Sequence, residues 1–153
     1  MQVFMDLVTN QALMSALAGW LIAQTTKILL EIATGKFSKE RVAGGGGMPS
    51  SHSATVTALA TGTAIACGLR SAEFAISFFF AIIVMYDAMG VRYETGEEAK
   101  ALNQLRERDL REGREPVTDR KLTEKIGHTP LEIAVGFLVG LGAAVLVCAI
   151  IPG

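Results

Sequence analysis

Apolar residues dominate four stretches of this chain, and the charged residues lie almost entirely between them. The four runs without Asp, Glu, Lys or Arg are residues 7–26, 53–69, 74–86 and 133–151. A helix that crosses a bilayer needs about 20 mostly apolar residues. The fourth run fits this length and the first is adequate, whereas the third reaches it only if Asp87 is included. The pattern therefore predicts an all-α integral membrane protein with about four transmembrane helices.

The composition agrees with a membrane setting and with one domain. Half of the 153 residues are hydrophobic, and the length is that of one domain, so we expect a single membrane-embedded domain over residues 1–153. A soluble helical bundle is the alternative. The net charge of −1, with acidic and basic residues interspersed, argues against a nucleic-acid partner.

The charged segments also predict an orientation. Four spans would place loops 35–51 and 92–128 on one face, and these loops hold nearly all Lys and Arg residues, Arg41 among them. Cytoplasmic loops carry an excess of Lys and Arg, so we predict that this face is cytoplasmic. Within the second loop, helix-forming residues predict a helix over 94–114 and a short helical turn over 119–126. We expect the two to form a solvated helical hairpin that caps the bundle.

The most informative local pattern is Gly-Gly-Gly-Gly-Met-Pro-Ser-Ser-His-Ser at residues 44–53. Glycine lets the backbone bend closely around a ligand, and Ser50 and Ser51 are candidate N-caps for a helix that follows. The free N–H groups of such a helix attract anions, and His52 adds a titratable imidazole. The run predicts a phosphate site, with a flexible turn before an ordinary capped helix as the alternative.

Further polar residues gather on the same predicted face as His52. A second histidine, His128, precedes the fourth span. The ends of the first and third spans carry Gln24, Lys27, Glu31, Asp87 and Arg92. Ionisable groups at membrane depth are costly and usually face a bundle interior or a water-filled cavity. We therefore expect them to converge, although a local Lys27–Glu31 ion pair and a helix-end arrangement of Asp87 with Arg92 are the alternatives.

The segment His128-Thr129-Pro130-Leu131-Glu132 admits two interpretations. Thr129 and Glu132, with Pro130 between them, form the pattern of a capping box with proline at the first helical position. Alternatively, Glu132 turns toward His128, fixes its tautomer and supports its protonated form. The two roles compete for one carboxylate, and the sequence leaves both open.

Two histidines at an anion-binding face suit hydrolysis of a phosphate monoester. One neutral imidazole can act as the nucleophile, and one protonated imidazole can supply the proton for the leaving alkoxide. Helix N–H groups and Lys or Arg side chains can stabilise charge on the phosphoryl oxygens. Two histidines without clustered cysteines or paired acids are too few ligands for zinc. We therefore expect no metal and no other cofactor.

These residues resemble a known superfamily. Pro49-Ser50-Ser51-His52 is similar to the Pro-Ser-Gly-His motif of the type 2 phosphatidic acid phosphatases (PAP2), which are related to acid phosphatases and vanadium-dependent haloperoxidases. His128-x-x-x-Glu132 resembles the end of the third motif of that superfamily. Segments 46–53, 85–92, 102–105 and 127–132 together resemble its divergent branch.

The resemblance implies a role for each of these residues. His128 would be the nucleophile that forms a phosphohistidine, and His52 would be the general acid. Backbone amides near Ser50 and Ser51 would hold the phosphate without a metal. Glu132 stands where the superfamily has an aspartate that supports the nucleophilic histidine.

The chain also departs from the superfamily pattern. The lysine-to-arginine-proline first motif has no match, and the arginine that should precede the third-motif histidine is missing. Lys27, Arg41 and Arg92 are the candidate replacements, and we place Asp87 with them in the substrate-binding set.

The sequence thus predicts a membrane lipid-phosphate phosphatase. Phosphatidic acid, phosphatidylglycerophosphate and isoprenoid phosphates are all candidate substrates. One alternative is an inactive phospholipid-binding or scaffolding membrane protein that kept the anion pocket. Another is a small transporter that uses Asp87 as a relay and works as a homo-oligomer, for which Gly136-x-x-x-Gly140 offers a packing face.

Overall fold

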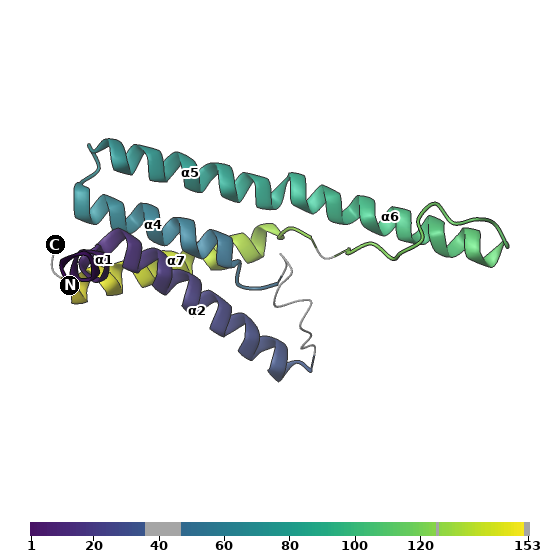
Figure 1. Cartoon of the computed structure of the whole chain (residues 1–153), viewed down its shortest axis with the longest axis horizontal. Coiled ribbons are helices and arrows are strands. Elements are labelled where there is room, and N and C mark those ends of the chain that lie inside the picture. The colour runs from purple at the N-terminus through teal and green to yellow at the C-terminus, as the bar shows by residue number, and fades with distance from the viewer. Residues whose placement is uncertain (36–46, 125, 152–153) are drawn as a thin grey trace.

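The chain folds into helices joined by short segments, as the computed structural model in Figure 1 shows for residues 1–35, 47–124 and 126–151. The helices are α1 (Gln2–Thr9), α2 (Gln11–Ala33), α4 (Ser51–Cys67), α5 (Ala72–Met89), α6 (Val91–Arg111) and α7 (Pro130–Ile150). The described residues contain no strand. The predicted all-α class is therefore confirmed.

Polar side chains fix where four of these helices begin. Asn10, Ser50, Ser71 and Thr129 are the N-caps of α2, α4, α5 and α7, and each side chain accepts a hydrogen bond from a backbone N–H of the first turn. Such caps satisfy N–H groups that have no intrahelical acceptor. The helix boundaries therefore follow from local sequence, including the start of α4 directly after the glycine–proline segment.

Helix α4 lies at the centre of the bundle and packs against α2, α5 and α7. Small residues let the backbones approach closely. A Cβ atom added at Gly19 of α2 would lie 2.8 Å from the Ala58 Cβ of α4, and one added at Gly62 would lie 2.8 Å from the Ser15 Oγ. Gly140 of α7 faces the main chain of α4 in the same way. Close packing of small residues is typical of helix contacts inside membranes.

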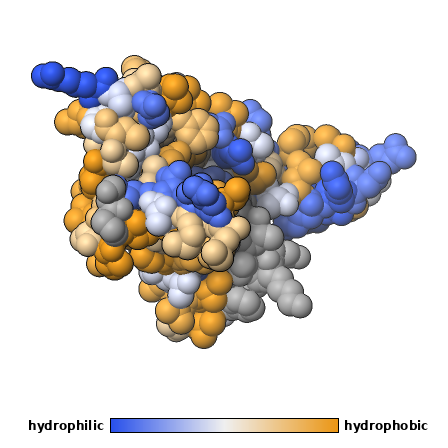
Figure 2. All heavy atoms as spheres, turned by 60° about the vertical axis from the view of Figure 1, so that its left-hand side comes forward, coloured by the Kyte–Doolittle hydropathy of each residue, from blue (hydrophilic) through white to orange (hydrophobic). Residues whose placement is uncertain are grey.

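Within the described residues, three helical segments are long and apolar enough to cross a membrane: Gln11–Ala33, Ala72–Arg111 and Pro130–Ile150. They expose large apolar side chains, such as Phe79 of α5 at 63% and Leu138 of α7 at 64%, and hydrophobic residues cover much of the bundle surface in Figure 2. The second predicted span corresponds to α4, which has 17 residues and is not among the three. The predicted count of four spans is therefore not confirmed.

The segment 92–128 differs from the predicted helical hairpin. Helix α6 continues the direction of α5 past Gly90 and projects away from the bundle (Figure 1). The chain then returns beside α6 as an extended segment, residues 112–124 and 126–129, which we call the return segment. The helical turn expected over 119–126 is absent from the described part of that range. Asn103 of α6 exchanges two hydrogen bonds with the backbone of Leu122, at 2.9 and 2.8 Å. Side chains of α6 thus satisfy backbone groups of the return segment, which therefore needs no helix of its own.

Candidate functional site

His128 is held at the start of α7 with its ring buried inside the protein. Its backbone N–H donates to the Ala88 carbonyl at the end of α5, at 3.0 Å, and its side chain is 1% exposed. The preceding Gly127 has φ +86° and packs against the backbone of Arg92 and Tyr93, so that a Cβ there would meet the Arg92 carbonyl carbon at 2.7 Å. Only glycine fits this close approach.

The two ring nitrogens of His128 have different surroundings. Nδ1 lies 3.3 Å from the Glu132 Oε2, whereas Nε2 is buried and has no hydrogen-bond partner among the described residues. When Nδ1 carries the proton and donates it to the carboxylate, Nε2 keeps its lone pair. A buried nitrogen without a hydrogen-bond partner costs free energy, so a ligand that bonds to Nε2 would remove this cost.

Glu132 performs both contacts that the sequence left open. Its Oε2 accepts the backbone N–H of Thr129 at 2.9 Å, and the Thr129 hydroxyl accepts the Glu132 N–H at 3.3 Å, which completes the capping box. The same Oε2 faces the His128 Nδ1. The capping role and the contact with His128 are therefore compatible and do not compete.

His52 lies in the first turn of α4, beside His128. The two ring centroids are 5.7 Å apart, and the rings meet edge to face at 65°. Unlike the His128 ring, His52 is exposed to solvent. Of the two sequence-predicted histidines, one is thus buried and the other lies at the surface of the same site.

Ser50, the N-cap of α4, links the start of α4 to α7. The Ser50 hydroxyl accepts the N–H of Ser53 at 3.3 Å, and the Ser50 N–H donates to the Glu132 carbonyl at 3.1 Å. The Ser50 N–H is therefore already bonded and is not available to a phosphate. Of the backbone amides expected to hold the phosphate, those of the residues after Ser50 are left. Those of Ser51 and His52 belong to the first turn of α4, where N–H groups have no intrahelical acceptor.

Lys27 of α2 is buried against the end of the glycine run. Lys27 is 2% exposed. A Cβ added at Gly47, which has φ +104°, would lie 2.9 Å from the Lys27 Cε. Among the described residues Lys27 forms no ion pair within 4 Å, so the Lys27–Glu31 pair expected as a local alternative is not formed. Lys27 does interact electrostatically with Glu31, Glu132 and His52.

Asp87 and Arg92 flank the junction of α5 and α6. The Arg92 Nε and the Asp87 Oδ2 are 2.6 Å apart, and both side chains are about half exposed. The local helix-end pair is therefore present. The charges of Asp87 and Arg92 also act on the pKa of His52. Arg41, the remaining candidate cation, lies outside the described residues.

The pKa of His52 is set by these surroundings. Partial loss of hydration lowers it below the usual value of histidine and is the largest cause. Interaction with His128 and the positive charges of Arg92 and Lys27 lower it further, and the Asp87 carboxylate opposes them. His52 therefore releases its proton more readily than an isolated imidazole.

A cavity of about 260 Å³ lies next to the Thr129–Glu132 capping box, between α6 and the return segment. Tyr93, Glu97, Lys100 and Glu124 supply its polar lining, together with Glu132. Sequence reasoning missed this cavity, because it depends on how the return segment pairs with α6. Within the described residues no three His, Cys, Asp or Glu side chains are grouped as a metal site requires.

Residues 8–143 match the sequence model of a protein family that is described as "Divergent PAP2 family". The chain belongs to the divergent PAP2 family. It is also similar to the uncharacterized membrane protein YuiD of Bacillus subtilis (strain 168), with 42% identity over 147 residues that cover 90% of this chain and 93% of that protein. No solved structure matches.

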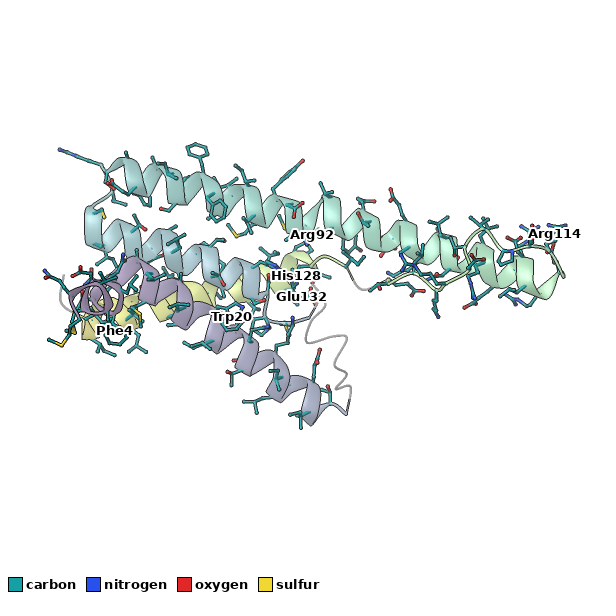
Figure 3. All side chains as sticks on the ribbon, viewed as in Figure 1. Phe4, Trp20, Arg92, Arg114, His128 and Glu132 are labelled. Atoms are coloured by element: carbon teal, nitrogen blue, oxygen red, sulfur yellow. The ribbon has the colours of Figure 1, made fainter. Side chains whose placement is uncertain are left out.

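Family membership confirms the resemblance that the motifs predicted, and both comparisons agree with a membrane protein. The matched range includes every residue placed in the site above. In Figure 3, Arg92, His128 and Glu132 lie close together where the bundle meets the projecting α6, while Arg114 lies just beyond the far end of α6. The polar residues of the site therefore gather at one end of the membrane bundle.

Proposed function

We propose that this protein is a membrane-bound phosphatase that hydrolyses a lipid phosphomonoester through a phosphohistidine on His128. The observation that carries this proposal is the state of the His128 ring. It is buried, its Nδ1 faces a carboxylate, and its Nε2 has no partner among the described residues. A nucleophilic histidine needs this combination of a fixed tautomer and a free lone pair.

The first step forms the phosphohistidine. The Nε2 lone pair of His128 attacks phosphorus in line with the bond to the alkoxide, and that phosphorus–oxygen bond breaks. Protonated His52 gives its proton to the departing oxygen, so that a neutral alcohol leaves. Glu132 stabilises the positive charge that develops on the His128 ring.

The second step returns the enzyme to its starting state. His52, now neutral, takes a proton from a water molecule, whose oxygen attacks phosphorus and breaks the bond to His128 Nε2. Inorganic phosphate is released and His52 is again protonated. Because the two rings are in edge contact in the described state, a phosphoryl group can enter between them only if the exposed His52 ring rotates.

Three groups can stabilise charge on the phosphoryl oxygens. The amides of Ser51 and His52 belong to the first turn of α4, and N–H groups at a helix N-terminus favour anions. Lys27 is a buried cation without an ion pair among the described residues. Arg92 is held by Asp87 at 2.6 Å and would need to shift its guanidinium to reach the substrate. Electrostatic stabilisation of this kind is usually the largest contribution to phosphoryl transfer.

The surroundings favour a lipid substrate. The site lies at one end of three helical segments that are long and apolar enough to span a bilayer, which is where the head groups of lipids lie. We further propose that this end faces the cytoplasm, because most Lys and Arg residues of the chain lie on it. Phosphatidic acid, phosphatidylglycerophosphate and isoprenoid phosphates all have the required phosphate group.

Phosphate release from these lipids by the purified protein in EDTA tests the proposal. Wild type should be active without a metal, and His128→Ala and His52→Ala should each lose about 10²-fold or more. Arg114→Ala, at an exposed position after α6, is the control and should match wild type. Equal turnover in all four proteins would refute the proposal. Lipid binding without any hydrolysis by wild type would instead indicate a phospholipid-binding protein.

A further inference from the structure

Helix α1 is amphipathic, with its polar and apolar residues on opposite sides. At 100° per residue, Gln2, Asp6 and Thr9 share one side of the helix. The other side carries Val3, Phe4, Leu7 and Val8. The helix contains no Lys or Arg.

The protein leaves the apolar side of α1 uncovered. None of the eight residues is buried, and Val3, Phe4 and Leu7 are 72%, 66% and 51% exposed. An isolated helix of this length is not stable in water. The contact of α1 with α2 is small, so another surface has to cover these side chains and stabilise the helix.

The position of α1 indicates what that surface is. In Figure 1, α1 is seen end-on, whereas α4, α5 and α7 run across the view, so α1 lies roughly perpendicular to the bundle. It lies near the C-terminal end of α7, where the Gln11 side chain donates to the Ile151 carbonyl at 2.6 Å and links the start of α2 to the end of α7. Figure 3 places Phe4 at one end of the bundle and His128 at the other end, where the bundle meets α6.

The exposed apolar surface of the bundle continues to the same end. Ile76 near the start of α5 is 71% exposed, and Ile150 at the end of α7 is 70% exposed. If α5 and α7 cross a bilayer, a helix perpendicular to them at their ends lies along the bilayer surface. An apolar face of this kind inserts at the boundary between head groups and acyl chains.

We propose that α1 is an interfacial helix that lies in the bilayer surface, on the leaflet opposite the His52–His128 site. Phe4 and Val3 insert among the acyl chains, and Asp6 faces water. Because α1 has an acidic residue and no basic one, its binding depends on apolar burial and not on anionic lipid. The helix thus fixes the depth of the N-terminus of α2 in the membrane.

Depth-dependent fluorescence quenching tests this placement in the full chain. In a Cys67→Ser, Cys148→Ser background, Phe4→Cys and Asp6→Cys are each labelled with an environment-sensitive fluorophore in vesicles of phosphatidylcholine. The replaced side chains are both exposed, so each variant should fold. Phe79→Cys, on the exposed surface of α5, is the membrane control, and Glu112→Cys, after α6, is the aqueous control.

We expect spin-labelled acyl chains to quench the label at position 4 about threefold or more strongly than the label at position 6. Quenching should be unchanged in high salt and in vesicles that contain phosphatidylglycerol. Equal, weak quenching at both positions would overturn the proposal. So would protection of position 4 that depends on protein concentration, because a second copy of the chain would then cover α1.

Discussion

Glu132 is the residue at which helix capping and the proposed chemistry meet, and Glu132→Gln separates them. The amide oxygen of Gln can still accept the Thr129 N–H, which the carboxylate accepts at 2.9 Å. The negative charge that faces His128 Nδ1 at 3.3 Å is lost. Because the same oxygen, Oε2, makes both contacts, the amide either keeps its oxygen there without the charge or turns its NH₂ toward Nδ1. The second orientation places the ring proton on Nε2 and removes the nucleophilic lone pair.

The two effects differ in size. Because one cap acceptor is kept, the free energy of unfolding should fall by less than about 1 kcal/mol. The rate should fall much further, since the wrong tautomer of a catalytic histidine costs about 10⁴-fold in a serine protease. We expect kcat to fall by about 10²–10⁴-fold, which is roughly 3–5 kcal/mol of activation free energy.

Thr129→Ala is the matched control. It removes the hydroxyl that accepts the Glu132 N–H at 3.3 Å and leaves the carboxylate beside His128, so it should lower stability by about 1 kcal/mol and leave kcat nearly unchanged. Denaturant unfolding in detergent and phosphate release, measured on both variants, give the comparison. If the two variants lose activity in proportion to their lost stability, Glu132 is only a capping residue and the reasoning fails.

Three further predictions concern packing, proton transfer and charge. Gly140→Ala should cost about 1–3 kcal/mol of stability, because its Cβ would overlap the α4 backbone. Gly142→Ala, which meets nothing within 4 Å, should be neutral or stabilising in the same unfolding assay. If His52 is the proton donor, kcat/KM should fall as the pH rises through its lowered pKa. Arg92→Gln removes a positive charge and should move that fall to higher pH, and an unmoved profile would contradict the assignment. Lys27→Met should reduce kcat/KM by about 10²-fold with soluble and lipid phosphomonoesters alike, whereas an unchanged value would remove Lys27 from the site.

Sequence patterns predicted the helical elements well because their causes are local. Ser50 and Thr129 are caps in the structure as they are in the pattern, and proline at the first position of α7 agrees with the predicted start. The convergence of His52 and His128 also followed from counting predicted spans, since His52 opens one span and His128 precedes another on the same predicted face. Their ring separation of 5.7 Å agrees with that inference.

Other features depend on contacts between distant segments and were not predictable. The return segment is extended because Asn103 and Arg106 of α6 bond its backbone, and helix propensity alone does not include such contacts. The Ser50 amide is occupied by the Glu132 carbonyl across 82 positions of sequence, at 3.1 Å. Nor does the one-dimensional pattern reveal that a single carboxylate oxygen of Glu132 can make two contacts.

The central claim is that His128 Nε2 is the atom that bonds to phosphorus. A crystal structure of the protein in lipid with orthovanadate, which adopts the geometry of the phosphoryl transition state, tests this directly. The account predicts vanadium bonded to His128 Nε2, with its oxygens near the amides of Ser51 and His52 and the His52 ring rotated away from its present edge contact. Vanadate bound elsewhere, with the His128 ring unbonded, would contradict this claim. So would a structure without bound vanadate at concentrations that inhibit the enzyme.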